Sequence, residues 1–162
     1  MLWVSLRSIG VLLLVGMSLW AANPSWADAV DPYVRRYLRV EESVELKLNS
    51  EGQTRSFSAA NLSSGKRFFE ENCKNCHVGG STLPDPTVSL SLEALKAATP
   101  PRDSILSLVA FLREPMTYDG AEYTYSCRQV SESWLSDPEA ANLAAFILRA
   151  AEKAPGWGNT TF

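Results

Sequence analysis

The sequence has a single histidine, three cysteines and three methionines in 162 residues. One histidine excludes a metal or cofactor site that needs two imidazole ligands, and three cysteines cannot all pair in intramolecular disulfides. Internal repeats, blocks of like charge and a linker long enough to separate two domains are also missing. The composition, 46% hydrophobic and 20% charged, is that of one ordinary globular domain.

No hydrophobic run is long enough for a membrane-spanning helix. The apolar run at residues 9–20 follows the lone charge of Arg7 and covers about 12 residues, against the roughly 20 that cross a bilayer. Ser25-Trp26-Ala27 follows it and matches a small-residue cleavage site. The sequence therefore predicts a signal peptide at residues 1–27 and one mature domain at 28–162; an uncleaved membrane anchor is the alternative.

The charge balance argues against nucleic acid as a partner. Loss of the leader removes Arg7, which leaves 14 Lys and Arg against 18 Asp and Glu, a formal net charge of −4. A basic footprint, which nucleic-acid binding needs, is absent. Any association with a membrane is expected to be peripheral. Export also brings the cysteines into an oxidising compartment, so a third sulfur without a partner needs another role.

The mature chain begins with the pattern of a short β-hairpin. Apolar and polar residues alternate around Leu46, and residues 49–52 form a turn signal. Asn61 or Ser63 is then expected to cap a helix over 65–70 that leads directly into Cys73.

Three further helices are predicted. Ser91 caps a short helix that ends before Pro100, and Pro101 starts a second helix that Pro115 ends. The third begins at Asp137 as its N-cap. The apolar positions that repeat with helical spacing are Leu92, Leu95 and Ala98 in the first, Ile105, Leu108, Val109 and Leu112 in the second, and Leu143, Phe146, Ile147 and Ala150 in the third.

The stretch Cys73-Lys74-Asn75-Cys76-His77 has three alternative interpretations besides a cofactor site. A dithiol redox site of the thioredoxin type needs a βαβ frame, whereas the upstream element here is helical. A structural zinc site needs four ligands, and only Cys127 remains as a further strong one. A disulfide between Cys73 and Cys76 would close a very tight loop.

Covalent attachment of one haem c uses all three motif residues. The thiols of Cys73 and Cys76 add across the haem vinyl groups, and the adjacent His77 is the proximal iron ligand. The predicted fold class is therefore mainly α: a small class I-like cytochrome c with a short N-terminal β-hairpin. Its N-terminal helix ends at the attachment site and crosses the C-terminal helix, and one haem edge is exposed.

Longer segments resemble a known family. The runs GKRFFEENCKNCHVGG and LEALKAATPPRDSILSLVAFLREPMTYDG and the tail Gly156-Trp157-Gly158 are similar to the cytochrome c-550 (PsbV) family, over most of the mature chain. The resemblance implies an extrinsic lumenal subunit of photosystem II. It further implies the thylakoid lumen of a cyanobacterium as location and photosystem II, or another redox protein, as partner.

The chain departs from this family at the second iron ligand, where the family has a histidine shortly after the segment matching residues 118–120. Here the sequence reads AEYTYSCRQV, and Cys127 is nearest to the expected position. The expected metal ligands are His77 and Cys127, with Met116 or an open site as alternatives; Cys127 as a simple buried residue is a further possibility. The chain is thus a divergent member.

Electron transfer at low potential is the expected function, because an anionic sulfur ligand favours iron(III). A structural role on photosystem II and a haem-thiolate redox or gas sensor are the alternatives. Nothing in the sequence suggests a hydrolytic enzyme. Tyr123 and Tyr125 are expected to alternate between pocket and solvent, while Trp134 and Phe146 are expected to form pocket or core walls.

Overall fold

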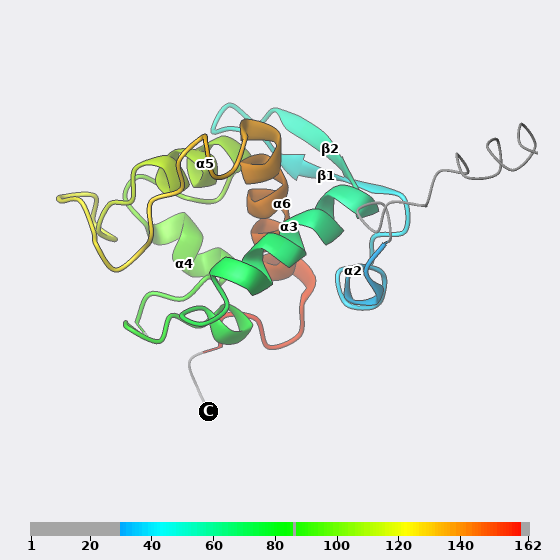
Figure 1. Cartoon of the computed structure of the whole chain (residues 1–162), viewed down its shortest axis with the longest axis horizontal. Helices are drawn as coiled ribbons and strands as arrows, with labels where there is room; N and C mark the ends of the chain where they lie inside the picture. The colour runs from blue at the N-terminus through cyan, green and yellow to red at the C-terminus, as the bar shows by residue number, and fades with distance from the viewer. Residues whose placement is uncertain (1–29, 86, 160–162) are drawn as a thin grey trace, which may run out of the picture.

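A computed structural model describes residues 30–85 and 87–159 (Figure 1). The predicted leader, residues 1–27, lies outside the described residues. Helices dominate the described chain and a single two-stranded sheet accompanies them. Of the helices in this part, none is long and apolar enough to cross a membrane.

The first elements are a short helix and the hairpin. Helix α2 (Pro32–Arg36) begins after Asp31, whose carboxylate accepts the backbone N–H of Tyr33 at 2.7 Å. Strands β1 (Ser43–Lys47) and β2 (Thr54–Ser58) pair antiparallel. The hairpin prediction is confirmed, and its buried face contains Leu46 and Phe57 because alternate residues of a strand share a face.

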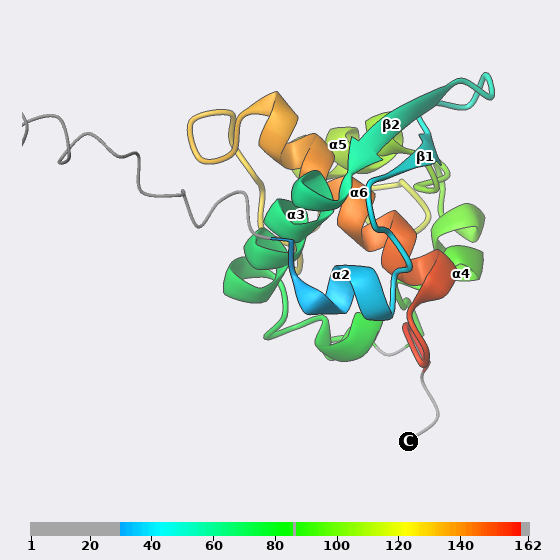
Figure 2. The same ribbon diagram turned by 90° about the vertical axis from the view of Figure 1, so that its right-hand side faces the viewer.

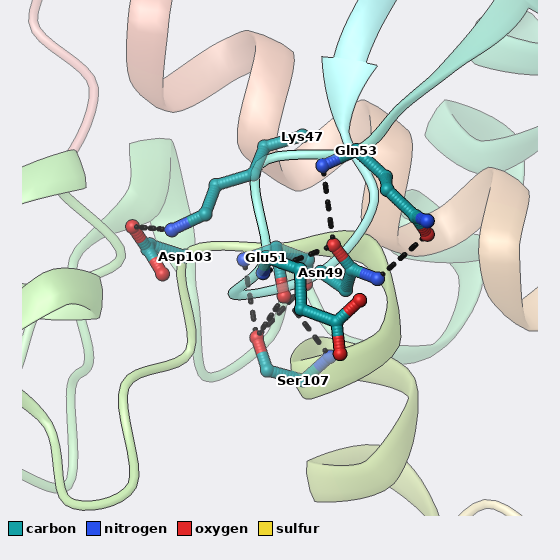
Figure 3. Close-up of polar contacts among 7 residues, drawn as sticks. Lys47, Asn49, Glu51, Gln53, Asp103 and Ser107 are labelled. Atoms are coloured by element: carbon teal, nitrogen blue, oxygen red, sulfur yellow. Dashed lines mark hydrogen bonds and ion pairs between the residues drawn. The ribbon is translucent and has the colours of Figure 1, made fainter.

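The end of β1 is bonded to the segment where helix α5 (Ile105–Arg113) begins, and Figure 3 shows the contact of Lys47 with Asp103. Lys47 forms an ion pair of 2.8 Å with Asp103, and the Leu48 carbonyl accepts the backbone N–H of Leu106 at 2.9 Å. Within the turn, Asn49 Oδ1 accepts the backbone N–H groups of residues 51 and 53. The hairpin thereby anchors the N-terminal end of α5.

Helix α3 (Ala59–Asn72) starts earlier than the sequence suggested. Its N-cap is Ser58, so the prediction of Asn61 or Ser63 as cap was wrong. The side chain of Asn61 instead accepts the backbone N–H of Ser58 and completes a capping box, which is why both positions show a capping signal. The helix ends with Cys73 as its C-cap, as expected.

Helix α4 (Leu92–Ala97) has the predicted N-cap, Ser91. Helix α5 does not begin at Pro101: its N-cap is Ser104, whose hydroxyl accepts the backbone N–H of Ser107. The intervening segment cannot be helical because the Arg102 backbone N–H is bonded back to the Leu95 carbonyl at 2.8 Å.

Helix α6 (Asp137–Lys153) is the longest described element. Its N-cap is Ser136, one residue before the predicted Asp137, since the Ser136 hydroxyl and backbone N–H both donate to Glu139 Oε2. The predicted helical face is confirmed: Leu143, Phe146, Ile147 and Ala150 are all buried.

Helices α3 and α6 cross (Figures 1 and 2), and Gly65 lies where they contact each other. A methyl carbon on Gly65 would lie 2.0 Å from the backbone oxygen of Asn142, so only glycine permits this approach. Beside the crossing, the rings of Phe69, Phe146 and Trp157 contact each other with centroids 5.4–5.8 Å apart.

The chain after α6 folds back over the segment that follows the cysteine motif. Trp157 Nε1 donates to the Leu90 carbonyl at 3.0 Å, and the Gly158 N–H donates to the Gly79 carbonyl at 2.8 Å. The Ser81 hydroxyl donates to the Asn159 carbonyl at 3.0 Å. The tail therefore covers the short 3₁₀ turn η2 (Val78–Gly80).

Candidate haem site

A cavity of about 350 Å³ lies between α4, α5, the segment after the cysteine motif and the loop over residues 116–127. In Figure 1 these elements lie on the opposite side of the molecule from α2. The walls of the cavity are largely apolar and contain Val88, Leu90, Leu95, Ala98, Leu108 and Phe111.

The cysteine motif forms a tight turn at the end of α3. The backbone N–H groups of Cys76 and His77 both donate to the Cys73 carbonyl, at 3.1 and 3.0 Å. Cys76 and His77 line the cavity; Cys73 does not, and packs against the hydrophobic core instead. Burial raises the pKa of the Cys73 thiol to about 11. All three cysteines are free thiols.

The imidazole of His77 has one nitrogen engaged. Its Nδ1 lies 3.2 Å from the hydroxyl oxygen of Thr82, which leaves Nε2 available to a metal. Burial lowers the pKa of His77, so the neutral ring, the form that binds metal, is favoured. Sequence reasoning missed Thr82, because a threonine in a loop has no distinguishing pattern.

The loop 116–127 contributes Thr124, Ser126 and Cys127 to the cavity. From the sequence, Tyr123 and Tyr125 are expected to alternate between pocket and solvent. Tyr123 and Tyr125 are 39% and 93% exposed and line no part of the cavity, so that prediction was wrong. Their rings contact each other outside, with centroids 5.1 Å apart.

Met116 also lines the cavity, so the structure brings both sulfur candidates to it. Of the aromatics, Phe146 is in the core as expected. Trp134 is 36% exposed, and the guanidinium carbon of Arg128 lies 4.5 Å from its ring centroid. Trp134 therefore forms neither a pocket wall nor a core wall, and that prediction was wrong.

Arg102 lines the cavity, and sequence reasoning assigned it no role. Its side chain lies over the ring of Phe111, with the guanidinium carbon 4.1 Å from the centroid. Burial raises the pKa of the Cys127 thiol, and the Arg102 charge opposes this rise. No sequence pattern marks Arg102, which follows two prolines. Its position at the site is visible only in the structure, where the later loop 116–127 lines the same cavity.

The donor set and the walls fit a haem. The thiol of Cys76 and the imidazole of His77 open on an apolar cavity that Met116 and Cys127 also line. The second motif thiol, Cys73, lies three positions earlier and packs against the hydrophobic core. Over residues 30–85 and 87–159, no group of three His, Cys, Asp or Glu side chains is placed to hold a bare metal ion. The zinc interpretation therefore gains no support from these residues.

The sequence matches the family model described as the cytochrome c-550 domain over residues 37–162. The chain belongs to the cytochrome c-550 family. Members of this family are typically electron carriers rather than enzymes, and cytochromes c have a c-type haem. The resemblance seen in the sequence is confirmed.

Curated relatives within the cytochrome c-550 family come from cyanobacteria. The chain is 58% identical over 162 residues to the cytochrome c-550-like protein of Thermosynechococcus vestitus, covering 96% of this chain and 93% of the relative. It is 50% identical over 161 residues to the photosystem II extrinsic protein V of Gloeobacter violaceus, covering 95% and 86%.

Among solved structures, the PsbV2 cytochrome from Thermosynechococcus elongatus is similar to this chain with a TM-score of 0.80. The identity is 64%, and the match covers 81% of this chain and 100% of that one. The predicted fold, a mainly helical class I-like cytochrome c with a short hairpin, is confirmed.

Proposed function

We propose that this member of the cytochrome c-550 family is a monohaem electron-transfer protein of low potential, with His77 as proximal and Cys127 as distal iron ligand. The observation that supports this most directly is that Cys127, which is far from the motif in the sequence, lines the same cavity as Cys76 and His77. When bound, the haem supplies an iron that changes its charge by one electron.

The proximal side of the proposed site rests on the turn at the end of α3. Cys73 and Cys76 would hold the haem through two thioether bonds, each the product of adding S–H across one vinyl C=C with no atom lost. The turn holds their backbones together, and Thr82 orients the His77 ring by accepting from its Nδ1–H. The Nε2 lone pair is then directed to the iron.

The distal side determines the potential. A thiol that reaches iron(III) is deprotonated outright, so the raised pKa of Cys127 is no obstacle to binding. The resulting anionic ligand stabilises iron(III) relative to a neutral methionine thioether, and the potential falls. A high midpoint in a redox titration would contradict this.

Export to the thylakoid lumen is part of the proposal. We infer in addition that the leader is cleaved after Ala27, so that the mature protein begins at Asp28. N-terminal sequencing of the protein from its native host tests this, because a chain that retains residues 1–27 would instead support a membrane anchor.

The decisive experiment is low-temperature EPR of the oxidised, haem-loaded protein beside Cys127→Ser and Met116→Leu. Both substitutions change a sulfur that lines the same cavity, so Met116→Leu is the matched control. We expect a low-spin thiolate signal that Cys127→Ser abolishes and Met116→Leu leaves unchanged. Identical spectra of wild type and Cys127→Ser would remove Cys127 from the iron.

A structural role on photosystem II is the second candidate, favoured by the 50% identity to a photosystem II extrinsic protein V. In that case the outer surface docks and the haem organises the fold. Retention of the purified protein on photosystem II core complexes in a pull-down separates the two roles: stoichiometric retention favours docking, and its absence favours a mobile carrier.

A further inference from the structure

Arg102 is a buried positive charge without a carboxylate partner. It is 8% exposed and forms no ion pair within residues 30–85 and 87–159. A guanidinium stays charged at every ordinary pH, and a buried unpaired charge is costly. Something must therefore compensate this charge in the functional protein.

Only part of the hydrogen-bonding capacity of the Arg102 guanidinium is used by the described residues. Its Nη2 donates to the carbonyls of Met116 and Thr117, at 3.1 and 2.6 Å. Nε and Nη1 have no acceptor among the described residues, yet no fully buried side-chain nitrogen there lacks a partner. These donors therefore reach open space, and the open space beside Arg102 is the cavity.

The carbonyls that Arg102 binds belong to the residues where the loop 116–127 begins. The same loop ends at Cys127, which lines the cavity together with Arg102. Arg102 thus binds the first residues of the loop 116–127 and lines the same cavity as the Cys127 sulfur at its end.

A second arginine holds the chain just after this loop. Arg113 donates to the carbonyls of Val130 and Leu135 at 3.0 and 2.9 Å. Unlike Arg102, it is paired with a carboxylate, that of Asp137 at 2.8 Å, and it does not line the cavity. Both arginines bind two backbone carbonyl groups of a loop. They differ because the charge of Arg102 lies at the cavity, whereas that of Arg113 is paired with Asp137 away from it.

We propose that Arg102 is a positioning residue of the distal haem site, which fixes the base of the loop 116–127 and offsets the negative charge of the Cys127 sulfur on iron. The inference rests on the proposed function, in which Cys127 binds the iron. A fixed positive charge beside the site favours the reduced form, so loss of Arg102 stabilises iron(III).

The test compares haem-loaded Arg102→Met, Arg102→Lys and Arg113→Met by redox titration. For Arg102→Met we expect about a tenfold rise in the ratio of iron(III) to iron(II) at a fixed applied potential, which is about 59 mV for a one-electron couple. Arg102→Lys, which keeps the charge, stays close to wild type. Arg113→Met lowers the unfolding temperature and leaves the potential unchanged.

A purely structural role predicts a different pattern. If Arg102→Met leaves the potential unchanged, or if Arg113→Met shifts it equally, the charge assignment is overturned. Far-UV circular dichroism verifies that each variant is folded. Arg102→Gln keeps an N–H donor and removes the charge; it must show the same shift and replaces Arg102→Met if that variant does not fold.

Repetition in the Cys127→Ser background identifies the group on which Arg102 acts. We expect the effect of Arg102→Met to fall to less than half there. An effect of full size means that Arg102 acts on another anionic group, such as a haem propionate, and overturns its assignment to the sulfur. Failure of the proposed function is visible separately, as identical EPR spectra of wild type and Cys127→Ser.

Discussion

Replacement of Gly65 by alanine tests whether the crossing of α3 and α6 limits the stability of the fold. The added methyl carbon would lie 2.0 Å from the Asn142 oxygen, 2.6 Å from its carbonyl carbon and 3.0 Å from the Leu143 nitrogen. All three are backbone atoms, which no side-chain rotation can move. Ordinary contact begins at 3.4 Å, so the helices must separate by about 1.4 Å in an interior that is already close-packed.

The expected loss can be bounded. Overpacking costs about 1–3 kcal/mol, and a clash of backbone on backbone belongs at the upper end. Alanine regains about 1 kcal/mol of helix propensity over glycine. The free energy of unfolding should therefore fall by about 2 kcal/mol, which lowers Tm by roughly 6–10 °C in a domain of this size.

Thermal unfolding of the haem-loaded protein, followed by circular dichroism, measures this loss. The control is Gly52→Ala in the hairpin turn, where an added methyl group meets nothing within 4 Å and only the positive φ of 83° opposes it. That strain costs about 1 kcal/mol. A Tm of Gly65→Ala at or above that of Gly52→Ala would refute the close-approach argument.

Two further predictions concern polar contacts. In haem-loaded Thr82→Val, His77 loses the acceptor of its Nδ1–H and becomes a less basic ligand, so the midpoint potential should rise; an equal or lower value in a redox titration would contradict this. The pKa of Glu139 is lowered by hydrogen bonds from Ser136, so its contribution to stability is present above the ordinary value of 4.5 and lost as pH falls through the folded pKa. Glu139→Gln should therefore flatten the decline of Tm in acid, because glutamine can keep the capping box but has no charge to lose. Parallel curves for the two proteins would count against a stabilising charge on Glu139.

The helical architecture was predictable because its signals are local. The spacing of Leu143, Phe146 and Ile147 follows from one helix face meeting the core, and no distant residue is needed to interpret it. Helix starts were less exact. Ser58 and Asn61 both carry capping signals, and only the bonded geometry shows which residue is the cap.

The site was predictable where covalent chemistry fixes residue spacing, as at Cys73, Cys76 and His77. Cys127 was selected by comparison with a family position, and the structure places it in the same cavity as His77. Arg102 could not be assigned, since its partners are carbonyl groups that any residue would supply. These hydrogen bonds exist only because the chain at residues 116 and 117 folds back to Arg102.

The tail after α6 joins the end of that helix to the segment after the cysteine motif. Residues 157–159 bind Leu90, Gly79 and Ser81, which follow the motif. The turn next to His77 and the end of α6 therefore cannot move apart without breaking these hydrogen bonds. Local opening at the motif and fraying of the helix end become one event, although the two segments are far apart in the sequence.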